Sequence, residues 1–190
     1  MKKIPTLFVR DHATGRISDE ITPGLARIVA GFGNATRKWD GTACLFRGGK
    51  WWKRYDAKRG KIPPVGFVPC GEPDLVTGHN PGWIQVGDGP GDRWHREAIG
   101  CGQDANYRPF EDERTYELCG PKLQGNPENL TGHWMIPHGE LILAAHDRSF
   151  IGLREWFESQ PIEGLVFWEA GAPVCKIKRR DFGFPWPVKP

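Results

Sequence analysis

Short runs of alternating apolar and polar residues dominate the chain and predict a β-rich fold. Helical periodicity is limited to residues 22–30 and 149–159. Thr22 and Ser149 are the predicted N-caps of these two helices. The strands before and after Gly48 are expected to pair as a β-hairpin. The predicted strands are residues 42–47, 50–55, 83–86, 114–119, 140–145, 164–168 and 174–178.

Length and composition are those of a single globular domain, which we assign to residues 1–190. Hydrophobic residues make up 38% of the chain, which is enough to build a core and to exclude global disorder. No uncharged stretch approaches the roughly 20 apolar residues of a membrane span, and no signal-peptide pattern precedes Arg10. The five cysteines form no CxxC pair, which favours free, buried thiols. We therefore expect a cytoplasmic, monomeric protein without membrane association.

The net charge of +3 conceals a segregation of charge along the chain. Residues 1–61 carry a net charge of +9, residues 62–169 carry −10 and residues 170–190 carry +4. Basic ends that met in space would suit a polyanion, and nearby acidic groups could hold a divalent cation. The alternative is a set of solvated charged faces without a role.

Residues 38–41 read Lys-Trp-Asp-Gly and stand directly before a predicted strand. Alone, this KxDG pattern equally fits a surface lysine beside an Asp-Gly turn. Other side chains that could take part in catalysis or binding follow along the chain. Arg54 lies on the second arm of the predicted hairpin, Glu117 lies in TYELCG, and Glu163 lies in IEGLVFW.

Two lysines, Lys176 and Lys178, lie in the last predicted strand. Side chains alternate between the two faces of a strand, so both lysines should point to one face and Ile177 to the core. The sequence therefore predicts two cations side by side.

These motifs resemble those of the covalent nucleotidyltransferases, the family of ATP-dependent DNA ligases, RNA ligases and mRNA capping enzymes. KWDG resembles motif I with its nucleophilic lysine, and Arg54 fits the arginine of the motif that follows. TYELCG resembles motif III, EGLVF motif IV and KIK motif V. YELCGPKLQGNPE, HWMIPHG and FGFPWP further resemble a small group of ATP-dependent 5'-to-3' RNA ligases. The resemblance covers almost the whole chain.

The resemblance implies an α+β fold with two packed antiparallel β-sheets, short flanking helices and the nucleotide between the sheets. This is the nucleotidyltransferase (ATP-grasp-like) ligase core, and we expect it here without an OB-fold. It also implies an ATP-dependent RNA ligase. Such an enzyme joins RNA 5'-phosphate and 3'-hydroxyl ends through a lysyl-AMP and an RNA-adenylate intermediate.

Lys38 would be the nucleophile in this chemistry. A lysine has an ordinary pKa of about 10.4, so the site must lower it before the amine can attack. Neighbouring cations do so, and the same charges would neutralise an α-phosphate. Arg37, Lys176 and Lys178 are the expected cations. Asp40 would orient the ammonium, and Gly41 would allow a tight turn.

The remaining nucleotide contacts follow from the resemblance. Glu117 would accept a ribose hydroxyl, and Glu163 would bind Mg²⁺ or Mn²⁺, with Glu117 as a second metal ligand. Arg54 belongs to the same nucleotide-binding set. For adenine stacking we consider Trp134, whose alternative role is ordinary core packing.

The residue before the nucleophile departs from the family pattern, since many relatives carry an acidic residue that contacts the base where this chain has Arg37. Thr36 or a backbone carbonyl could supply that contact instead.

Several other residues keep two interpretations. Residues 51–54 (WWKR) suit either nucleic-acid stacking or a strand with one buried aromatic face. Arg179 and Arg180 would contact a phosphate or lie on a solvated surface. His133 and His138 are separated by four residues and are considered as a metal pair, but sharing one face would require a helix, which Pro137 weakens.

Two functions remain as alternatives to the RNA ligase. One is a GTP-dependent capping-type nucleotidyltransferase. The other is a catalytically inactive, ligase-like module that binds nucleic acid.

Overall fold

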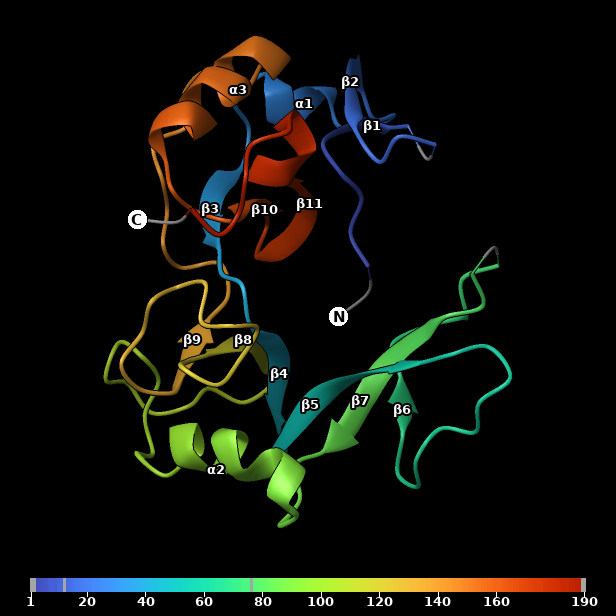
Figure 1. The fold of residues 1–190 in the computed structure, drawn as a ribbon, viewed down its shortest axis with the longest axis vertical. Helices are drawn as coiled ribbons and strands as arrows, with labels where there is room; N and C mark the ends of the chain where they lie inside the picture. Colours follow the sequence, from blue (N-terminus) through green and yellow to red (C-terminus); the bar gives the residue numbers. More distant parts are fainter. Residues whose placement is uncertain (1–2, 12, 76, 189–190) are drawn as a thin grey trace. The chain divides into compact units, whose positions relative to one another are not determined.

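The computed structural model describes residues 3–11, 13–75 and 77–188, and this part of the chain has an α+β architecture (Figure 1). It forms two compact units. Unit 1 consists of Met1–Lys3 and Asp40–His138, and unit 2 of Ile4–Trp39 and Gly139–Pro190. The chain passes from unit 2 to unit 1 within the KxDG motif. The assignment of residues 1–190 to one domain stays a prediction.

Unit 1 is built on a six-stranded antiparallel sheet in the order β6-β7-β5-β4-β8-β9. A short 3₁₀ turn, η1 (Pro90–Asp92), leads into helix α2 (Arg93–Ile99), which packs against β9. The strands are β4 (Thr42–Arg47), β5 (Lys50–Ala57), β6 (Val68–Pro69), β7 (Asn80–Gln85), β8 (Arg114–Cys119) and β9 (Trp134–Pro137).

The core of unit 1 lies on the α2 side of this sheet. Tyr116, Leu118 and Met135 are fully buried there, and Trp51 and Ala98 of α2 join them in one hydrophobic cluster. Because side chains alternate along each strand, the residues between these core positions point to the opposite face of the sheet. That opposite face carries the polar residues discussed below.

The predicted hairpin is confirmed by the pairing of β4 with β5. Gly48 and Gly49 form its turn with φ values of 57° and 68°. Two consecutive positive φ values are what a two-residue hairpin loop of the primed type requires, and glycine adopts them without a steric cost.

Unit 2 contains a three-stranded antiparallel sheet in the order β11-β10-β3 and a separate two-stranded sheet, β1-β2. Its hydrophobic core includes Leu165, Phe167 and Ile177 of the larger sheet together with Phe157 of α3 and Ile28 of α1. The elements are β1 (Phe8–Arg10), β2 (Ile17–Ile21), α1 (Ala26–Val29), β3 (Asn34–Lys38), α3 (Phe150–Ser159), β10 (Gly164–Glu169), β11 (Ala172–Lys178) and η2 (Arg179–Phe182).

The α+β class is confirmed, but the prediction of two sheets is wrong, since the described residues form three. Residues 140–145 were expected to be a strand and are not. Leu141 and Leu143 each share one backbone hydrogen bond with β3, which does not extend into a ladder. The helix expected at 22–30 is confined to α1, because the Thr22 hydroxyl donates to the carbonyl of Thr6 instead of capping a helix.

The helix expected at 149–159 is confirmed as α3, with Ser149 as its N-cap. The Ser149 side chain accepts a hydrogen bond from the amide of Gly152 at 3.0 Å. In the described part of the chain, no helix is both long and apolar enough to cross a membrane.

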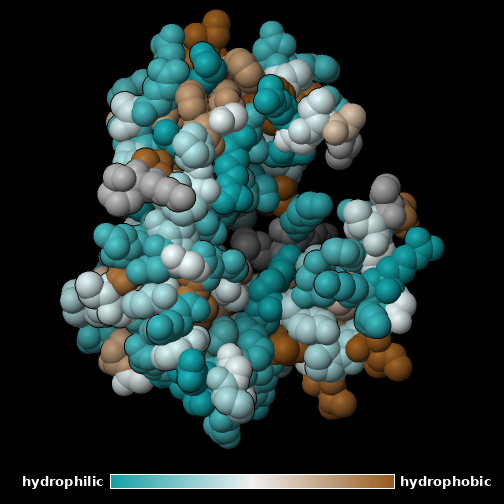
Figure 2. All heavy atoms as spheres, in the orientation of Figure 1, coloured by the Kyte–Doolittle hydropathy of each residue, from teal (hydrophilic) through white to brown (hydrophobic). Residues whose placement is uncertain are grey.

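Exposed apolar side chains gather on one segment of unit 1, residues 62–75. Ile62, Val65 and Leu75 are almost fully exposed and belong to neither core. Figure 2 shows that most of the visible surface is hydrophilic, with brown side chains at the outer edge of this part of unit 1. Three basic residues, Lys58, Arg59 and Lys61, precede the segment and are exposed as well.

Candidate functional site

Three strands of unit 2 place two of the predicted lysines in one row. Lys38 ends β3 and stands opposite Gly164 of β10, and Gly164 stands opposite Lys178 of β11 on its other side. Residues opposite one another share a face of the sheet, so both lysine side chains flank Gly164 on one face. A Cβ atom at Gly164 would lie 2.4 Å from the Ile177 carbonyl oxygen. The close approach of β10 and β11 therefore requires glycine at this position.

Glu163 lies at the centre of this row, because it directly precedes Gly164. One of its carboxylate oxygens pairs with the Lys38 ammonium, and the other lies 2.9 Å from Lys178 Nζ. The Lys38 ammonium also donates to the carbonyl of Trp39 at 3.4 Å. Glu163 is 4% exposed. A buried carboxylate between two ammonium groups compensates the desolvation of all three charges.

The next row along the same face joins Thr36, Val166 and Lys176. Ile177 is fully buried, whereas the lysines on either side of it are partly exposed. This confirms the predicted alternation in the last strand. The lysine face is opposite the face that packs on the helices, since Leu165 and Ile177 belong to the hydrophobic core.

Thr36 is less accessible than expected for a base contact, whereas Arg37 is partly exposed. Thr36 is 1% exposed, and its hydroxyl donates to the Val166 carbonyl at 3.0 Å. It therefore contributes to the packing of β3 against β10. The guanidinium of Arg37 lies 3.9 Å from the centre of the Trp39 ring, a cation–π contact. A nucleotide contact by either side chain stays a prediction.

Unit 1 places Arg54, Glu117 and Trp134 on one face of its sheet. The register pairs Trp52 with Leu45, Leu45 with Thr115, and Cys119 with Trp134. Arg54 and Glu117 are each two residues from a member of this series, so they share its face. This face is opposite the one covered by α2. The three predicted nucleotide residues of unit 1 thus lie outside the hydrophobic core cluster.

Arg54 and Trp134 have different surroundings on this face. The Arg54 guanidinium lies 5.5 Å from the centre of the Trp83 ring and donates to Cys70 Sγ at 3.5 Å. Trp134 is half-buried and meets the ring of Tyr107 edge-on at 6.1 Å. Ordinary core packing is therefore not the role of Trp134, although adenine stacking stays a prediction.

The structure separates the two interpretations of residues 51–54. Trp51 is buried against Tyr116 in the core of unit 1. Lys53 points to the same side and pairs with Asp92, which lies 6% exposed at the start of α2. The buried-face interpretation thus holds for Trp51 and Lys53, while Arg54 points the other way.

The second half of the KxDG motif is held by two carboxylates of unit 1. The Asp40 amide donates to Glu128 Oε1 at 2.9 Å, and the Gly41 amide donates to Glu117 Oε1 at 3.1 Å. A Cβ atom at Gly41 would lie 2.2 Å from the carbonyl oxygen of Leu118. The motif needs glycine here for this close approach and not for a positive φ.

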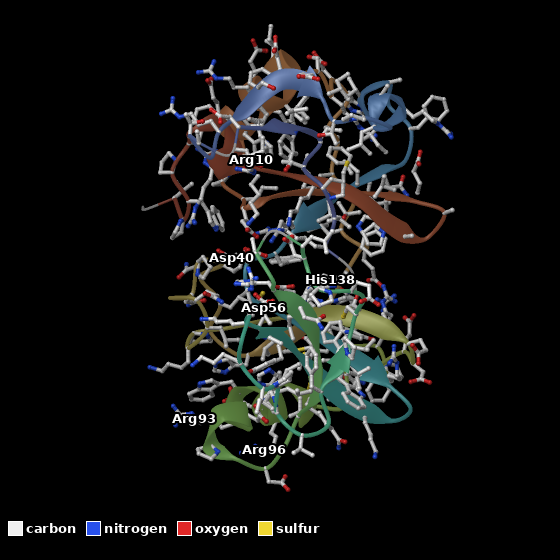
Figure 3. The ribbon with its side chains drawn as sticks, turned by 90° about the vertical axis from the view of Figure 1, so that its right-hand side faces the viewer. Arg10, Asp40, Asp56, Arg93, Arg96 and His138 are labelled. Carbon is white, nitrogen blue, oxygen red and sulfur yellow. The ribbon has the colours of Figure 1, made fainter. Side chains whose placement is uncertain are left out.

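The contacts of Glu128 and of His138 with the KxDG motif and Glu117 were not predicted. His138 Nε2 lies 2.9 Å from Glu117 Oε2, and its Nδ1 lies 3.0 Å from Thr115 Oγ1. Figure 3 shows His138 and Asp40 toward one end of unit 1, with Arg93 and Arg96 of α2 toward the other. The stretch YELCGPKLQGNPE, which carries Glu128, was the available signal.

His133 belongs to a different cluster from His138. Its Nδ1 lies 2.7 Å from Glu97 of α2, and its ring stacks on that of Trp94 at 4.6 Å. Nor do the described residues contain any group of three or more His, Cys, Asp or Glu side chains arranged to hold a metal ion. The two histidines do not form a metal pair, because strand β9 (Trp134–Pro137) lies between them and each contacts a different carboxylate.

Arg179 has neither of the roles expected for it. It is 8% exposed, and its guanidinium donates to the carbonyls of Gln160 and Pro185, each at 3.0 Å, and to that of Phe157. It therefore satisfies carbonyl groups at the C-terminal end of α3. Arg180 is exposed, and its guanidinium donates to the carbonyl of Trp186 at 2.7 Å.

Comparison with protein-family models and with curated proteins gives no match. A function for this chain must therefore be argued from the chemistry of its own residues. Two sets are available, namely the Lys38, Glu163 and Lys178 cluster of unit 2 and the Glu117 face of unit 1.

The cysteines offer no reactive thiolate that the structure supports. All five are thiols outside any disulfide, and Cys44, Cys119 and Cys175 are buried, as expected for most of them. Burial, together with the charge of Glu117, raises the pKa of Cys44 well above its ordinary value. Burial also raises the pKa of Cys175 to about 12. Neither thiol is ionised near neutral pH, so neither can act as a nucleophile or metal ligand there.

Proposed function

We propose that the protein is an ATP-dependent RNA ligase that joins a 5'-phosphate to a 3'-hydroxyl. The observation that supports this most is the row formed by Lys38, Glu163 and Lys178. This row supplies an amine that could act as a nucleophile, a carboxylate that could hold a divalent cation and a second cation for the phosphate, all of which suit nucleotidyl transfer. The order of the five sequence motifs supports the same proposal.

In the proposed reaction, Lys38 Nζ attacks the α-phosphate of ATP and forms a P–N bond while the bond to pyrophosphate breaks. The Lys38 ammonium must first lose a proton, because only the free amine has a lone pair. Lys176 and Lys178 would neutralise charge on the phosphate. AMP then passes to the RNA 5'-phosphate, and the 3'-hydroxyl displaces AMP to seal the strand.

The Glu163 carboxylate fits a hard divalent cation, which takes oxygen ligands and retains several waters. We assign Mg²⁺ or Mn²⁺ to Glu163, with the other ligands coming from phosphate and water. When bound, the ion would supply positive charge to the phosphates. Glu117 would accept a ribose hydroxyl and supply a second metal ligand; its two oxygens lie within hydrogen-bond distance of the Gly41 amide and of His138 Nε2.

The remaining assignments follow the sequence motifs. Arg54 would contact the nucleotide, and Trp134 would stack on adenine from the same sheet face as Glu117. We also propose that the protein acts in the cytoplasm as a monomer.

Labelling distinguishes this proposal from the alternatives. The protein is incubated with Mg²⁺ and ATP or GTP labelled at the α-phosphate, and label that survives denaturation is measured. The ligase predicts label from ATP, a capping-type enzyme label from GTP, and an inactive binding module no label. Lys38→Ala should abolish the label, whereas Lys50→Ala, at an exposed lysine on β5, should keep it.

A second assay separates the steps of the reaction. Lys38 is the nucleophile only in the first step, so Lys38→Ala should still seal RNA that is already adenylated at its 5' end. Label on the Lys38→Ala protein would overturn the assignment of the nucleophile.

A further inference from the structure

His138 restrains the carboxylate of Glu117 through a connected set of hydrogen bonds. Its backbone amide donates to the Thr115 carbonyl at 3.1 Å and continues the pairing of β8 with β9. Its ring lies 3.0 Å from the Thr115 hydroxyl and 2.9 Å from Glu117 Oε2. The other oxygen of Glu117 accepts the Gly41 amide at 3.1 Å. Glu117 therefore has one orientation in which all these bonds are made.

The contact between His138 and Glu117 persists in both protonation states of the imidazole. An ionised carboxylate can only accept, so His138 Nε2 must carry the hydrogen. The Thr115 hydroxyl can donate to Nδ1 of the neutral ring or accept from Nδ1 of the charged ring. Restraint of the carboxylate thus needs no particular charge on His138.

The two side chains are shielded but not sealed from solvent. The exposed fractions are 16% for His138 and 12% for Glu117. A carboxylate in such a position can still accept a hydrogen bond from a ligand. Low exposure strengthens that bond, because fewer waters compete for the same oxygen.

We propose that His138 is a positioning residue that holds Glu117 in the orientation for accepting a ribose hydroxyl of ATP. This rests on the proposed ligase function and on the ribose role of Glu117. A site whose acceptor is fixed rejects a sugar that lacks the hydroxyl, because the acceptor is then left without its partner. A carboxylate free to rotate toward solvent would not discriminate in this way. His138 therefore sets the preference for ribonucleotide over deoxynucleotide.

The test measures Lys38 labelling with ATP, 2'-deoxyATP and 3'-deoxyATP. Three variants are compared with the wild type. His138→Gln can place an amide N–H where Nε2 lies and so keep the bond to Glu117. His138→Asn reaches only the Nδ1 position, and His138→Ala reaches neither.

Wild type should prefer ATP over one of the two deoxynucleotides by about tenfold or more in kcat/KM, as the loss of one hydrogen bond to a charged group implies. His138→Ala and His138→Asn should bring this ratio to within about twofold of one, mainly through a higher KM for ATP. His138→Gln should restore most of the preference. In the Glu117→Gln background, His138→Ala should change the ratio no further.

An unchanged ratio in both His138→Ala and His138→Asn overturns the inference, and so does a wild type that does not distinguish ATP from either deoxynucleotide. Those results leave the ligase proposal intact, because the wild type is still labelled by ATP. A wild type without any label refutes the ligase proposal itself, and the inference with it. Thermal melting identifies a misfolded variant, and if His138→Ala does not fold, the comparison of His138→Asn with His138→Gln decides.

Discussion

The carboxylate of Glu163 pairs with the ammonium of Lys38, although the two residues lie 125 positions apart in the sequence. The pairing of β3 with β10 brings them together, because Lys38 stands opposite the glycine that follows Glu163. Glu163 also accepts from Lys178 at 2.9 Å. It is thus the carboxylate between two ammonium groups on this face. Any reaction at Lys38 Nζ must first disrupt this ion pair.

Glu163→Gln should reduce the rate of Lys38 labelling about 100-fold or more, even at saturating ATP, because it removes both a counter-charge and the proposed metal ligand. The rate is measured over a range of Mg²⁺ and Mn²⁺ concentrations, and a chelator should stop the wild type. Glu155→Gln, at an exposed position of α3, is the matched control. Labelling of the wild type without a divalent ion would contradict the prediction.

Gly41→Ala should destabilise unit 1 by about 1 to 3 kcal/mol, because the new methyl group would overlap the Leu118 carbonyl. Relief of this overlap should also move the Gly41 amide away from Glu117 and slow Lys38 labelling. Gly89→Ala is the control, since no atom lies within 4 Å of its Cβ position and its φ of −64° suits any residue. Urea unfolding of both variants checks the difference. Equal stability of the two would show that the strand can move away without a cost.

Arg179→Ala should lower the free energy of unfolding by about 2 to 4 kcal/mol, because it leaves buried carbonyls without donors. Arg180→Ala should cost about 1 kcal/mol or less, since its guanidinium is exposed and contacts one carbonyl. The salt dependence of RNA binding should not change in Arg179→Ala, because the buried guanidinium is not available to a phosphate. A smaller salt slope in Arg179→Ala, with its stability unchanged, would return Arg179 to the nucleic-acid surface.

The sequence pattern best predicted the helices and strands whose form depends on residues close together in the chain. Strands β4, β5 and β8 have alternating residues or a glycine turn at their ends, and α3 has a serine cap. Strand β3 was missed because its polar residues, NATRK, show no apolar alternation. Helix α2 was missed because it is short and follows a stretch rich in glycine and proline. Both depend on neighbours that are distant in sequence.

In the candidate site, too, the features that depend on local sequence were predicted and those that depend on strand pairing were not. Motif order selected Lys38, Glu163 and Lys178, and the register of three strands brings them into contact. The contact of His138 with Glu117 depends on the register between β8 and β9, which no local pattern specifies. Arg179 was misjudged for a related reason. A basic residue after a strand suggests surface, whereas the end of a helix elsewhere in the fold supplies buried carbonyls for it.

His95 of α2 is a buried histidine that is 7% exposed. Neither of its ring nitrogens makes a hydrogen bond to the described residues, and Nδ1 lies 3.8 Å from Asp92 Oδ1. Burial lowers the pKa of His95, with Lys53 and Arg96 acting in the same direction and Asp92 opposing them. The neutral form is therefore favoured in the folded state more than in the unfolded chain.

The lowered pKa of His95 makes the folded state less stable at acidic pH. The unfolded chain takes up the proton first as the pH falls, since its histidine keeps the ordinary value of about 6.5. The stability that neutral His95 contributes is complete above that value and is lost as the pH falls below it. For Asp92, burial raises the pKa, but hydrogen bonds from Lys53 and the Gly87 amide outweigh burial and lower it overall. Asp92 therefore acts only in a more acidic range.

The wild type should lose free energy of unfolding as the pH falls from about 7.5 to about 5.5, and His95→Leu should lose less. Leucine is an apolar side chain of similar size that fills the site and cannot be protonated. The free energy of unfolding is measured by urea at both pH values. His79→Gln serves as the control, because the His79 side chain is 46% exposed and contacts Asp56 at 2.7 Å outside the buried core. If His95→Leu and the wild type lose the same free energy over this range, protonation of His95 does not destabilise unit 1.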